Sequence, residues 1–420
     1  MRELGNQYTQ DDAHLQNIHM NKAKVSIVRA HDYDYDEIYA AMEKGIELIG
    51  GLAKIVPPGS KVFVKINHLS PPSPAERGIV THPVFVEVVL DLLKKVSADI
   101  TVGDDIQSGT GDGFKVSGFR QMCQRIGVRL TNFKETGFVE IVCGGHFLEK
   151  VYLSKISLDA DVIINLPKLK THSLCVFTGG VKNMYGTIPI GLRKKFHAEY
   201  IRNENFSQVL TDIFSVVRPQ LTIMDGIIAM EGEGPAAGKL RRLGVILASQ
   251  DTVAVDAVVA KIIGVNPMDI YTIRYSDERG LGVGNLQNIK VVGESIDSVT
   301  VPDFKLPASV VDTLTRRVPR GLPRFILRQL SIKPNVIERL CTGCAECEKI
   351  CPVGAISVSS KMAKIDHGIC IECMCCHEVC RFNAIVPKRS ITGSTIRFLI
   401  NILPNIVRKL MAITSRGYGI

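Results

Sequence analysis

Residues 161–172 read DVIINLPKLKTH, and the fold follows from the two parts of this stretch. The apolar, β-branched run DVIINL (161–166) predicts a buried strand, and a polar, basic segment comes directly after it. The same alternation recurs between Lys24 and Val292. Further strand-like runs are KVSIVRA (24–30), KVFVKIN (61–67), DITVGDD (99–105), VEIVCG (139–144), LTIMDG (221–226), GVILAS (244–249) and IKVVG (289–293).

Segments with apolar residues at helical spacing separate these runs. They are DEIYAAMEKGIELIGGL (36–52), HPVFVEVVLDLLKKV (82–96), FKVSGFRQMCQRIG (114–127), FSQVLTDIFSVV (206–217) and TVAVDAVVAKIIG (252–264). The alternation predicts an α/β domain whose mostly parallel sheet carries helices on both faces. Ligands of such sheets bind beyond the carboxyl ends of the strands, so we expect the functional site there. No G-x-x-x-x-G-K-S/T and no G-x-G-x-x-G motif follows a strand, so a conventional nucleotide-binding fold is not supported.

Composition places the chain in a broad class. Its 420 residues are 45% hydrophobic, enough for two or three domains with real cores. We expect a cytoplasmic protein, because the polar first thirty residues hold no apolar signal region and no stretch of about 18 apolar residues occurs. The formal charge of +9 is concentrated in residues 303–420, which hold 18 Lys and Arg against 8 Asp and Glu. Such an excess can face nucleic acid, anionic lipid, an acidic redox partner or only solvent; we expect no nucleic acid partner.

Nine of the twelve cysteines lie between Cys341 and Cys380 at metal-ligand spacing. Cys341 to Cys351 have the pattern C-x2-C-x2-C-x3-C-P, and Cys370 to Cys380 repeat it 29 residues later, without the final proline because Arg381 stands there. Each half then ends in C-x-x-x-A-I. In this pattern three cysteines of one half and the fourth of the other bind each 4Fe–4S cluster. One cluster is assigned to Cys341, Cys344, Cys347 and Cys380, and the other to Cys370, Cys373, Cys376 and Cys351.

On these motifs, residues 335–388 resemble a bacterial-type dicluster ferredoxin domain, a small α+β fold. A zinc site is the competing interpretation, but it does not account for the third cysteine of each loop or for the crossed fourth ligand. Cys375 is out of register with the repeat and is interpreted as a spectator. Outside the module, we expect Cys123 and Cys143 to be structural, and the role of Cys175 stays open.

The chain from about 24 to 300 resembles the family called domain of unknown function 362 (DUF362), whose members often carry a ferredoxin module. The stretches that carry this resemblance are VKINHL (64–69), THP (81–83), NLPKLKTH (165–172), GGVKNMYG (179–186), MDGIIAMEGEGPAAG (224–238) and SQDTVAVDA (249–257). A weaker likeness links His172 and Gly179-Gly180-x-Lys182 to the nickel-pincer lactate racemase family. In that family the lysine tethers the cofactor and the histidine does acid/base work. The Pro-Gly that should follow the lysine is missing here, so a nickel cofactor is not carried over.

The stretch LPKLKTHSLCVFTGGVKNMYG (166–186) is interpreted as a basic, flexible loop that binds a carboxylate or phosphate. Lysines supply charge, asparagines neutral donors, and the Gly-Gly pair close backbone approach. The predicted substrate-binding residues are Lys65, Asn67, Asn165, Lys168, Lys170, Gly179, Gly180, Lys182 and Asn183. The predicted catalytic residues are His172 and His68, with His82 a third histidine able to titrate near neutrality.

Five carboxylates, Asp225, Glu231, Glu233, Asp251 and Asp256, can balance these lysines or hold a divalent ion, and Asp104 and Asp105 can join them. The alternative interpretation of each group is structural. Lysines after strands are often only solvated, and a single histidine is more often a hydrogen-bonding core residue than a catalyst. Asp251 is well placed to cap the helix that begins at Thr252.

The predicted organisation is an α/β domain (1–301), a basic connector with several prolines (302–333), a dicluster ferredoxin domain (334–388) and an amphipathic tail (389–420) that can contact anionic lipid. Two functions are compatible with it. The first is an iron–sulfur oxidoreductase that exchanges electrons with a small anionic molecule or cofactor precursor bound in the α/β domain. The second is a non-enzymatic electron carrier or assembly factor whose α/β domain recognises a partner protein.

Overall fold

The computed structural model describes residues 22–68, 73–97, 99–106, 112–200, 202–307, 332–372, 374–380 and 382–389. Most of the predicted connector (308–331) and tail (390–420) therefore lies outside the described residues. Among the residues described, no helix has the length and apolar content needed to cross a bilayer.

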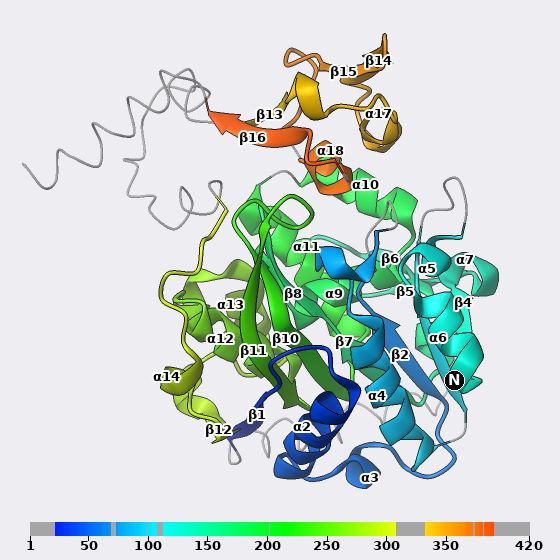
Figure 1. Cartoon of the computed structure of the whole chain (residues 1–420), viewed down its shortest axis with the longest axis vertical. Coiled ribbons are helices and arrows are strands. Elements are labelled where there is room, and N and C mark those ends of the chain that lie inside the picture. Colours follow the sequence, from blue (N-terminus) through cyan, green and yellow to red (C-terminus); the bar gives the residue numbers. More distant parts are fainter. Residues whose placement is uncertain are drawn as a thin grey trace, which may run out of the picture.

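A ten-stranded sheet forms the centre of the α/β domain (Figure 1). Its order is β12-β1-β11-β10-β7-β2-β3-β4, with β8 paired to β10 and β9 paired to β8. The strands are β1 (Ala23–Arg29), β2 (Val62–Ile66), β3 (Ile100–Asp104), β4 (Arg129–Asn132), β7 (Val162–Leu166), β8 (Lys168–His172), β9 (Val176–Thr178), β10 (Leu221–Glu231), β11 (Lys239–Ser249) and β12 (Ile289–Gly293). Strands β10, β7, β2, β3 and β4 run parallel, so their carboxyl ends meet along one edge, here called the carboxyl edge.

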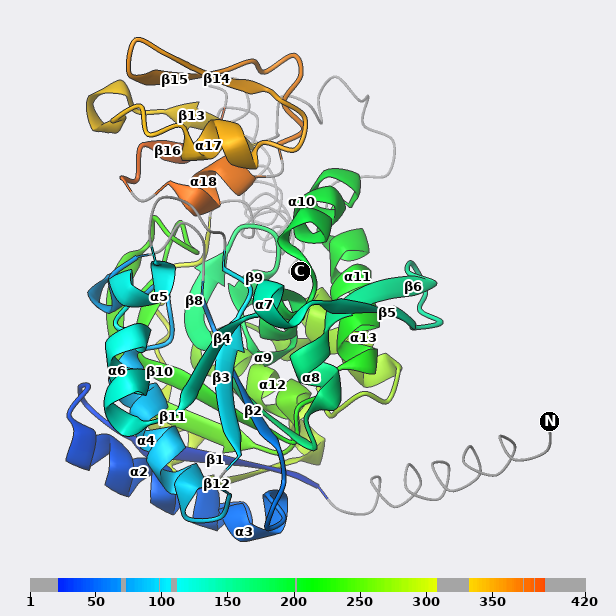
Figure 2. The ribbon, with the colours of Figure 1, turned by 90° about the vertical axis from the view of Figure 1, so that its right-hand side faces the viewer.

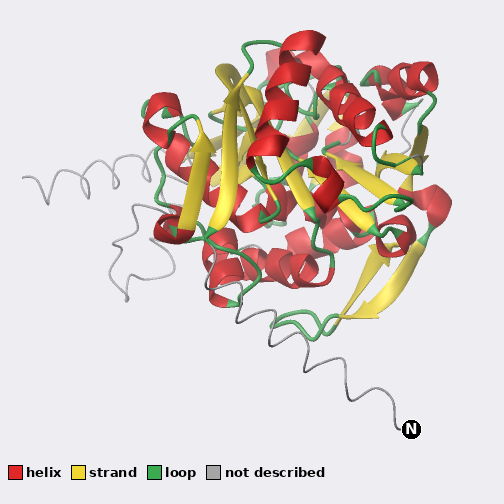
Figure 3. Cartoon of the chain, turned by 90° about the horizontal axis from the view of Figure 1, so that it is seen from below, coloured by secondary structure: helices red, strands yellow, loops and turns green. Residues whose placement is uncertain are grey.

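Helices cover both faces of this sheet (Figure 3), which confirms the predicted fold class. One face carries α2 (Tyr35–Leu48), α3 (Leu52–Ile55), α4 (Pro83–Lys94), α5 (Gly113–Val116) and α6 (Phe119–Ile126). The other carries α9 (Gly180–Asn183), α10 (Ile190–Glu199), α11 (Asn203–Val216), α12 (Thr252–Ile262) and α13 (Tyr271–Glu278). Strand β2 shows the alternation: Val62, Val64 and Ile66 belong to the first core and Phe63 to the second.

Side-chain caps fix where the main helices begin. The Asp34 side chain accepts a hydrogen bond from the Glu37 amide at the start of α2, and Asp251 accepts one from Ala254 at the start of α12. His82 does the same for Val84, with Pro83 in the first turn of α4. The cap predicted for Asp251 is therefore confirmed. Shorter elements are α7 (Phe133–Thr136), α8 (Lys155–Asp159), α14 (Ile296–Val299), η1 (Ala75–Arg77), η2 (Met184–Thr187), η3 (Pro267–Asp269) and η4 (Leu286–Asn288).

The prediction of a flexible loop over 166–186 is wrong. The segment forms β8, β9, α9 and η2, and all five residues of β8 are buried. The reason is that β10 continues to Glu231, beyond the end of β7, and pairs there with β8: Asp225 lies opposite Lys168 and Met230 opposite Lys170. The run 139–144 also differs from expectation, because β5 (Phe138–Val142) pairs with β6 (Lys150–Ser154) in a separate two-stranded sheet.

The C-terminal module, residues 332–389, packs around its own small core of Cys347, Ile356, Ala363, Ala384 and Ile385. Its elements are β13 (Ile332–Val336), η5 (Glu338–Leu340), α17 (Glu346–Ile350), β14 (Ile356–Ser359), β15 (Met362–Ile365), α18 (Cys375–Val379) and β16 (Ile385–Arg389). Strands β13 and β16 pair antiparallel, as do β14 and β15. The module lies over the carboxyl edge, with α18 nearest the α/β domain (Figure 2).

Candidate functional site

Lys65 lies at the carboxyl end of β2 in a buried ion pair. Its Nζ is 2.8 Å from Asp104 Oδ2, and both side chains are at most 2% exposed. Asp104 also accepts hydrogen bonds from the backbone amides of His68 and Asp105, each within 2.8 Å. Burial lowers the pKa of Lys65, while the charge of Asp104 acts to raise it. The Lys65 charge is therefore already neutralised inside the protein.

Lys168 forms a second buried pair, with Asp225 on β10 at 2.9 Å. Tyr33 joins the pair: its hydroxyl donates to Asp225 Oδ1 at 2.8 Å and accepts a hydrogen bond from Lys168 Nζ. The Tyr33 ring stacks on His82 with centroids 3.7 Å apart, and the His82 amide donates to Asp225 Oδ2. Burial raises the pKa of Tyr33 well above its ordinary value and lowers that of His82 to about 4. Tyr33 was not predicted from the sequence, because its partners are far away along the chain.

The other two lysines differ from each other. Lys170 is 2% exposed and donates from Nζ to the carbonyl oxygen of Ile79, so it holds the loop between η1 and α4. Lys182 is half-buried at the end of α9, with Nζ 6.0 Å from the centroid of the Tyr185 ring. Within the described part of the chain, no carboxylate forms an ion pair with Lys182. Of the four predicted lysines, Lys182 is thus the one whose charge is best placed to meet a ligand.

Three asparagines form a chain of amide hydrogen bonds from β2 to β7. Asn67 Nδ2 donates to Asn183 Oδ1, and Asn183 Nδ2 donates to Asn165 Oδ1, each at 2.8 Å. Asn165 Nδ2 continues to the Gly180 carbonyl at 3.1 Å. The structure therefore brings the three predicted asparagines together, but their amide groups mainly form hydrogen bonds with one another and not with a ligand. Asn67 Oδ1 is a buried acceptor for which the described residues supply no donor.

The Gly179-Gly180 pair lets backbone amides approach an acceptor closely, but that acceptor is a side chain of the protein itself, Asp256. The amides of Gly180 and Val181 donate to the two oxygens of Asp256, at 2.6 and 3.1 Å. A Cβ on Gly179 would collide with the same carboxylate. Burial raises the pKa of Asp256 to about 7, although the two amide hydrogen bonds act to lower it.

Asp256 should make stability depend on pH. In the unfolded chain its pKa is near 3.8, so between about pH 4 and pH 7 the unfolded chain loses a proton that the folded chain keeps. The free energy of unfolding should therefore fall with rising pH in that window, by at most about 1.4 kcal/mol per pH unit for this group. Asp256→Asn removes the effect. Urea unfolding of both proteins from pH 4.5 to 7.5 should show wild type losing stability relative to the variant, and a constant difference would contradict this.

The two histidines predicted as catalytic lie in different surroundings. His68 is 5% exposed, and its Nε2 is 2.9 Å from Ser117 Oγ beside the rings of Phe114 and Phe119. Burial lowers the pKa of His68 to about 4, so at neutral pH the ring is uncharged. His172 ends β8 fully buried, and its Nδ1 accepts a hydrogen bond from the Leu174 amide at 3.1 Å. Their catalytic roles stay a prediction.

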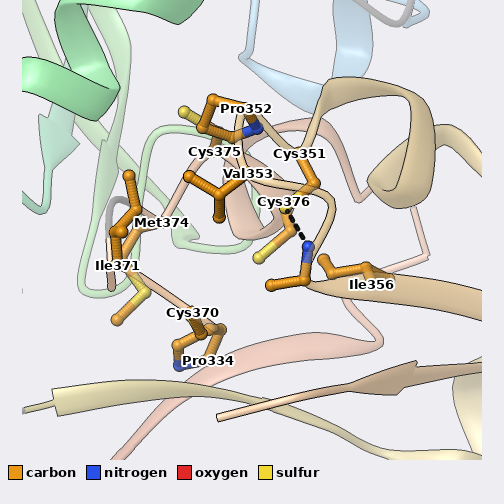
Figure 4. A pocket seen from close by; sticks show the side chains of 11 residues that line it. Pro334, Cys351, Pro352, Val353, Ile356, Cys370, Ile371, Met374, Cys375 and Cys376 are labelled. Atoms are coloured by element: carbon orange, nitrogen blue, oxygen red, sulfur yellow. Dashed lines mark hydrogen bonds between the residues drawn. The ribbon is translucent and has the colours of Figure 1, made fainter. Parts of the chain in front are cut away.

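The C-terminal module contains two cavities, each lined by cysteines from both halves of the repeat. The first is lined by Cys341, Cys344, Cys347 and Cys380, together with Phe382 and Ile385. The second is lined by Cys351, Cys370 and Cys376, with Cys375, Pro334 and Met374 beside them (Figure 4). Cys373, the remaining predicted ligand, lies outside the described residues. The first cavity thus has all four cysteines of one predicted set, and the second has three of the other set together with Cys375; their role as cluster ligands stays a prediction.

The backbone around both cavities fits the 4Fe–4S ligands of a ferredoxin. The amide of Ala355 donates to Cys351 Sγ and that of Ala384 to Cys380 Sγ, both at 3.2 Å and at equivalent positions of the repeat. Ala345 and Met374, also equivalent, both adopt a left-handed conformation with φ of 61°. Hydrogen bonds from backbone amides to sulfur tune a cluster's potential. Cys375 is buried against Ile350 and Val379, next to the second cavity.

Cysteine thiolates can bind either a zinc ion or the irons of a 4Fe–4S cluster. Across the described residues, no three Cys, His, Asp or Glu side chains converge on one metal position. A zinc ion draws four ligands to about 2.3 Å from a single centre. The thiolates of a 4Fe–4S cluster instead bind four separate irons and stand farther apart.

Comparisons with known proteins agree with this geometry. The family model for the domain of unknown function DUF362 matches residues 62–261, and that for the 4Fe-4S binding domain matches 334–357. A thylakoid-associated protein of Synechocystis sp. is 32% identical over 310 residues, which cover 72% of this chain and 92% of that protein. Ferredoxin-2 of Chlorobaculum tepidum is 40% identical over 47 residues, 11% of this chain and 76% of that protein.

Among solved structures, the lactate racemase apoprotein of Thermoanaerobacterium thermosaccharolyticum matches 56% of each chain at 12% identity, with a TM-score of 0.38. That similarity is too low to support an argument about chemistry. The long match to the Synechocystis protein and the two family models together are decisive. The chain belongs to the DUF362 family and carries a C-terminal 4Fe–4S binding domain.

Proposed function

We propose that the chain is a two-cluster iron–sulfur redox protein that passes electrons to or from a molecule at the carboxyl edge of the α/β domain. The first cluster would be held by Cys341, Cys344, Cys347 and Cys380, and the second by Cys351, Cys370, Cys373 and Cys376. The observation that carries the proposal is the sorting of the described cysteines into two cavities, each lined from both halves of the repeat. Bound clusters would supply one-electron transfer.

The proposed electron partner is a small anionic molecule or a cofactor precursor. Its binding is supported by the position of the C-terminal module over the carboxyl edge of the sheet (Figure 2). Lys182 would supply the positive charge, and the buried Asn67 Oδ1 would accept a hydrogen bond from a hydroxyl or amide of the same molecule. Lys65 and Lys168 would keep their internal partners and hold the strand ends in place.

A second function is favoured by those same ion pairs. With Lys65, Lys168 and the Gly180 amide already bound to carboxylates, little fixed charge remains for a strongly anionic substrate. On this account the chain is an electron carrier or assembly factor, and its α/β domain recognises a partner protein. The basic excess in residues 303–420 would then favour an acidic partner.

Anaerobic purification separates these functions. Iron and sulfide analysis should give about eight of each per chain, and electron paramagnetic resonance should show reduced 4Fe–4S clusters. Mass spectrometry of the released small molecules should find an organic anion, which Lys182→Ala loses while the iron stays. Lys95→Ala, an exposed lysine far from the edge, is the control. Full iron without a bound molecule would favour the carrier, and zinc or about four irons would contradict the two-cluster proposal.

A further inference from the structure

His377 occupies an unusual position in the C-terminal module. It lies on α18 between Cys376, which lines the second cavity, and Cys380, which lines the first. Its side chain is fully buried. Both ring nitrogens face carbonyl oxygens: Nδ1 is 2.7 Å from Ile385 O in β16 of the module, and Nε2 is 3.0 Å from Glu233 O in the α/β domain. The ring thus bridges the two parts of the chain.

Two further hydrogen bonds between the two parts are longer. Arg77 Nη2 donates to Asn383 Oδ1 at 3.3 Å, and Lys194 Nζ donates to the Lys349 carbonyl at 3.3 Å on the surface. The Lys194 contact fixes little, because a long, exposed side chain retains much of its conformational freedom. The His377 side chain is instead fully buried, and its contact with the Glu233 carbonyl is shorter than these two hydrogen bonds.

In the α/β domain, the residue next to Glu233 connects this contact to strand β8. The residue after Glu233 is Gly234, whose amide donates to Thr171 Oγ1 at 3.1 Å. Gly234 packs so closely on Thr171 that a Cβ there would collide with the Thr171 carbonyl. Thr171 precedes His172, a predicted site residue. One short route therefore runs from Cys376 and His377 through the Glu233-Gly234 peptide to Thr171 and His172.

We propose that His377 is a positioning residue that holds the C-terminal module against the carboxyl edge. It does so through its contact with Glu233, which Gly234 and Thr171 connect to β8. This attachment, here called the seat, consists of His377, Glu233, Gly234 and Thr171. It would fix the distance between the cluster at Cys376 and the end of β8, and it would keep water from the face of the module that covers this edge. The inference rests on the proposed function, since it assigns His377 a purpose only if the module holds clusters that serve this edge.

Two conservative variants separate the two ring contacts. The amide of asparagine can replace Nδ1, so His377→Asn keeps a donor facing the Ile385 carbonyl and loses the contact with the Glu233 carbonyl. The longer glutamine can replace Nε2, so His377→Gln keeps a donor facing the Glu233 carbonyl. By hydrogen exchange measured on the anaerobic, iron-loaded protein, peptides covering 232–238 should exchange about tenfold faster or more in His377→Asn and near the wild-type rate in His377→Gln.

A second readout is the reduction potential of the clusters. Loosening the module in His377→Asn admits water, which stabilises the more negatively charged reduced form, so the potential of the second cluster should rise. His377→Gln should restore the wild-type value. Thr171→Val loosens the same seat from the α/β side without touching the module, and it should speed exchange at 232–238 even if His377→Asn assembles poorly. Lys194→Ala is the control: it removes an exposed hydrogen bond to the Lys349 carbonyl, away from 232–238, and should change little.

The inference is overturned if exchange and potential in His377→Asn equal those of wild type, or if His377→Gln fails as His377→Asn does. In the latter case the ring would act by packing and not through its contact with Glu233. Iron and sulfide analysis distinguishes a failure of this inference from a failure of the proposed function. A wild-type protein without clusters contradicts the function itself, whereas fully loaded variants with an unchanged seat contradict the role of His377 alone.

Discussion

Replacing Cys380 by serine is expected to lower the iron content from about eight to about four per chain. Cys380 belongs to the second half of the cysteine repeat by sequence, but it lines the cavity of Cys341, Cys344 and Cys347. Serine has nearly the same shape and is a much weaker iron ligand, so the first cluster should be lost and the second kept. Iron and sulfide analysis of anaerobically purified protein measures this directly.

A double variant tests whether the ligands cross. If Cys341 and Cys380 hold the same cluster, Cys341→Ser with Cys380→Ser should lose no more iron than either single variant. If each half of the repeat held its own cluster, the double variant would lose nearly all iron. Cys375→Ser is the matched control: it removes a buried cysteine beside the second cavity that is not a predicted ligand, and it should keep the full iron content.

Lys65→Met is expected to destabilise the α/β domain by about 3 to 5 kcal/mol. The substitution leaves the Asp104 carboxylate buried without its cationic partner, and Asp104 is only 2% exposed. Urea unfolding of the iron-loaded protein at pH 7, followed by circular dichroism, measures the change. Adding Asp104→Leu should recover part of the loss, because removing both charges leaves no uncompensated ion in the core.

An exposed pair provides the comparison. Lys95 and Glu43 lie 3.1 Å apart, but their side chains are 57% and 49% exposed. Lys95→Met should therefore cost at most about 1 kcal/mol. If Lys65→Met were as mild as Lys95→Met, Lys65 would not depend on Asp104, and its assignment to the structure of the sheet edge would fail.

The sequence predicts the main strands well because buried parallel strands are continuous apolar runs. The cysteine sets can also be proposed from the sequence, because ligand spacing within a short loop is a local property, and seven of the eight predicted ligands line the two cavities. Strand β8 was missed because Lys168 and Lys170 give it the composition of a solvated loop. Their burial depends on Asp225 and on the Ile79 carbonyl, partners that lie 57 and 91 residues away along the chain.

The same limit applies to the candidate site. The sequence places lysines, asparagines and a Gly-Gly pair near one sheet edge, and the structure joins most of them to one another or to internal carboxylates. Composition cannot show which charges are already paired. Lys182 and Asn67 Oδ1 can be told apart from the other predicted groups only in three dimensions.

The most direct test of the two-cluster account is a crystal structure of the anaerobic protein with anomalous data collected at the iron edge. The account predicts two separate iron peaks, one in the cavity of Cys341, Cys344, Cys347 and Cys380 and the other in the cavity of Cys351, Cys370 and Cys376, with His377 seated on the Glu233 carbonyl. A single iron peak, a zinc signal in either cavity, or a module placed away from the carboxyl edge would contradict it.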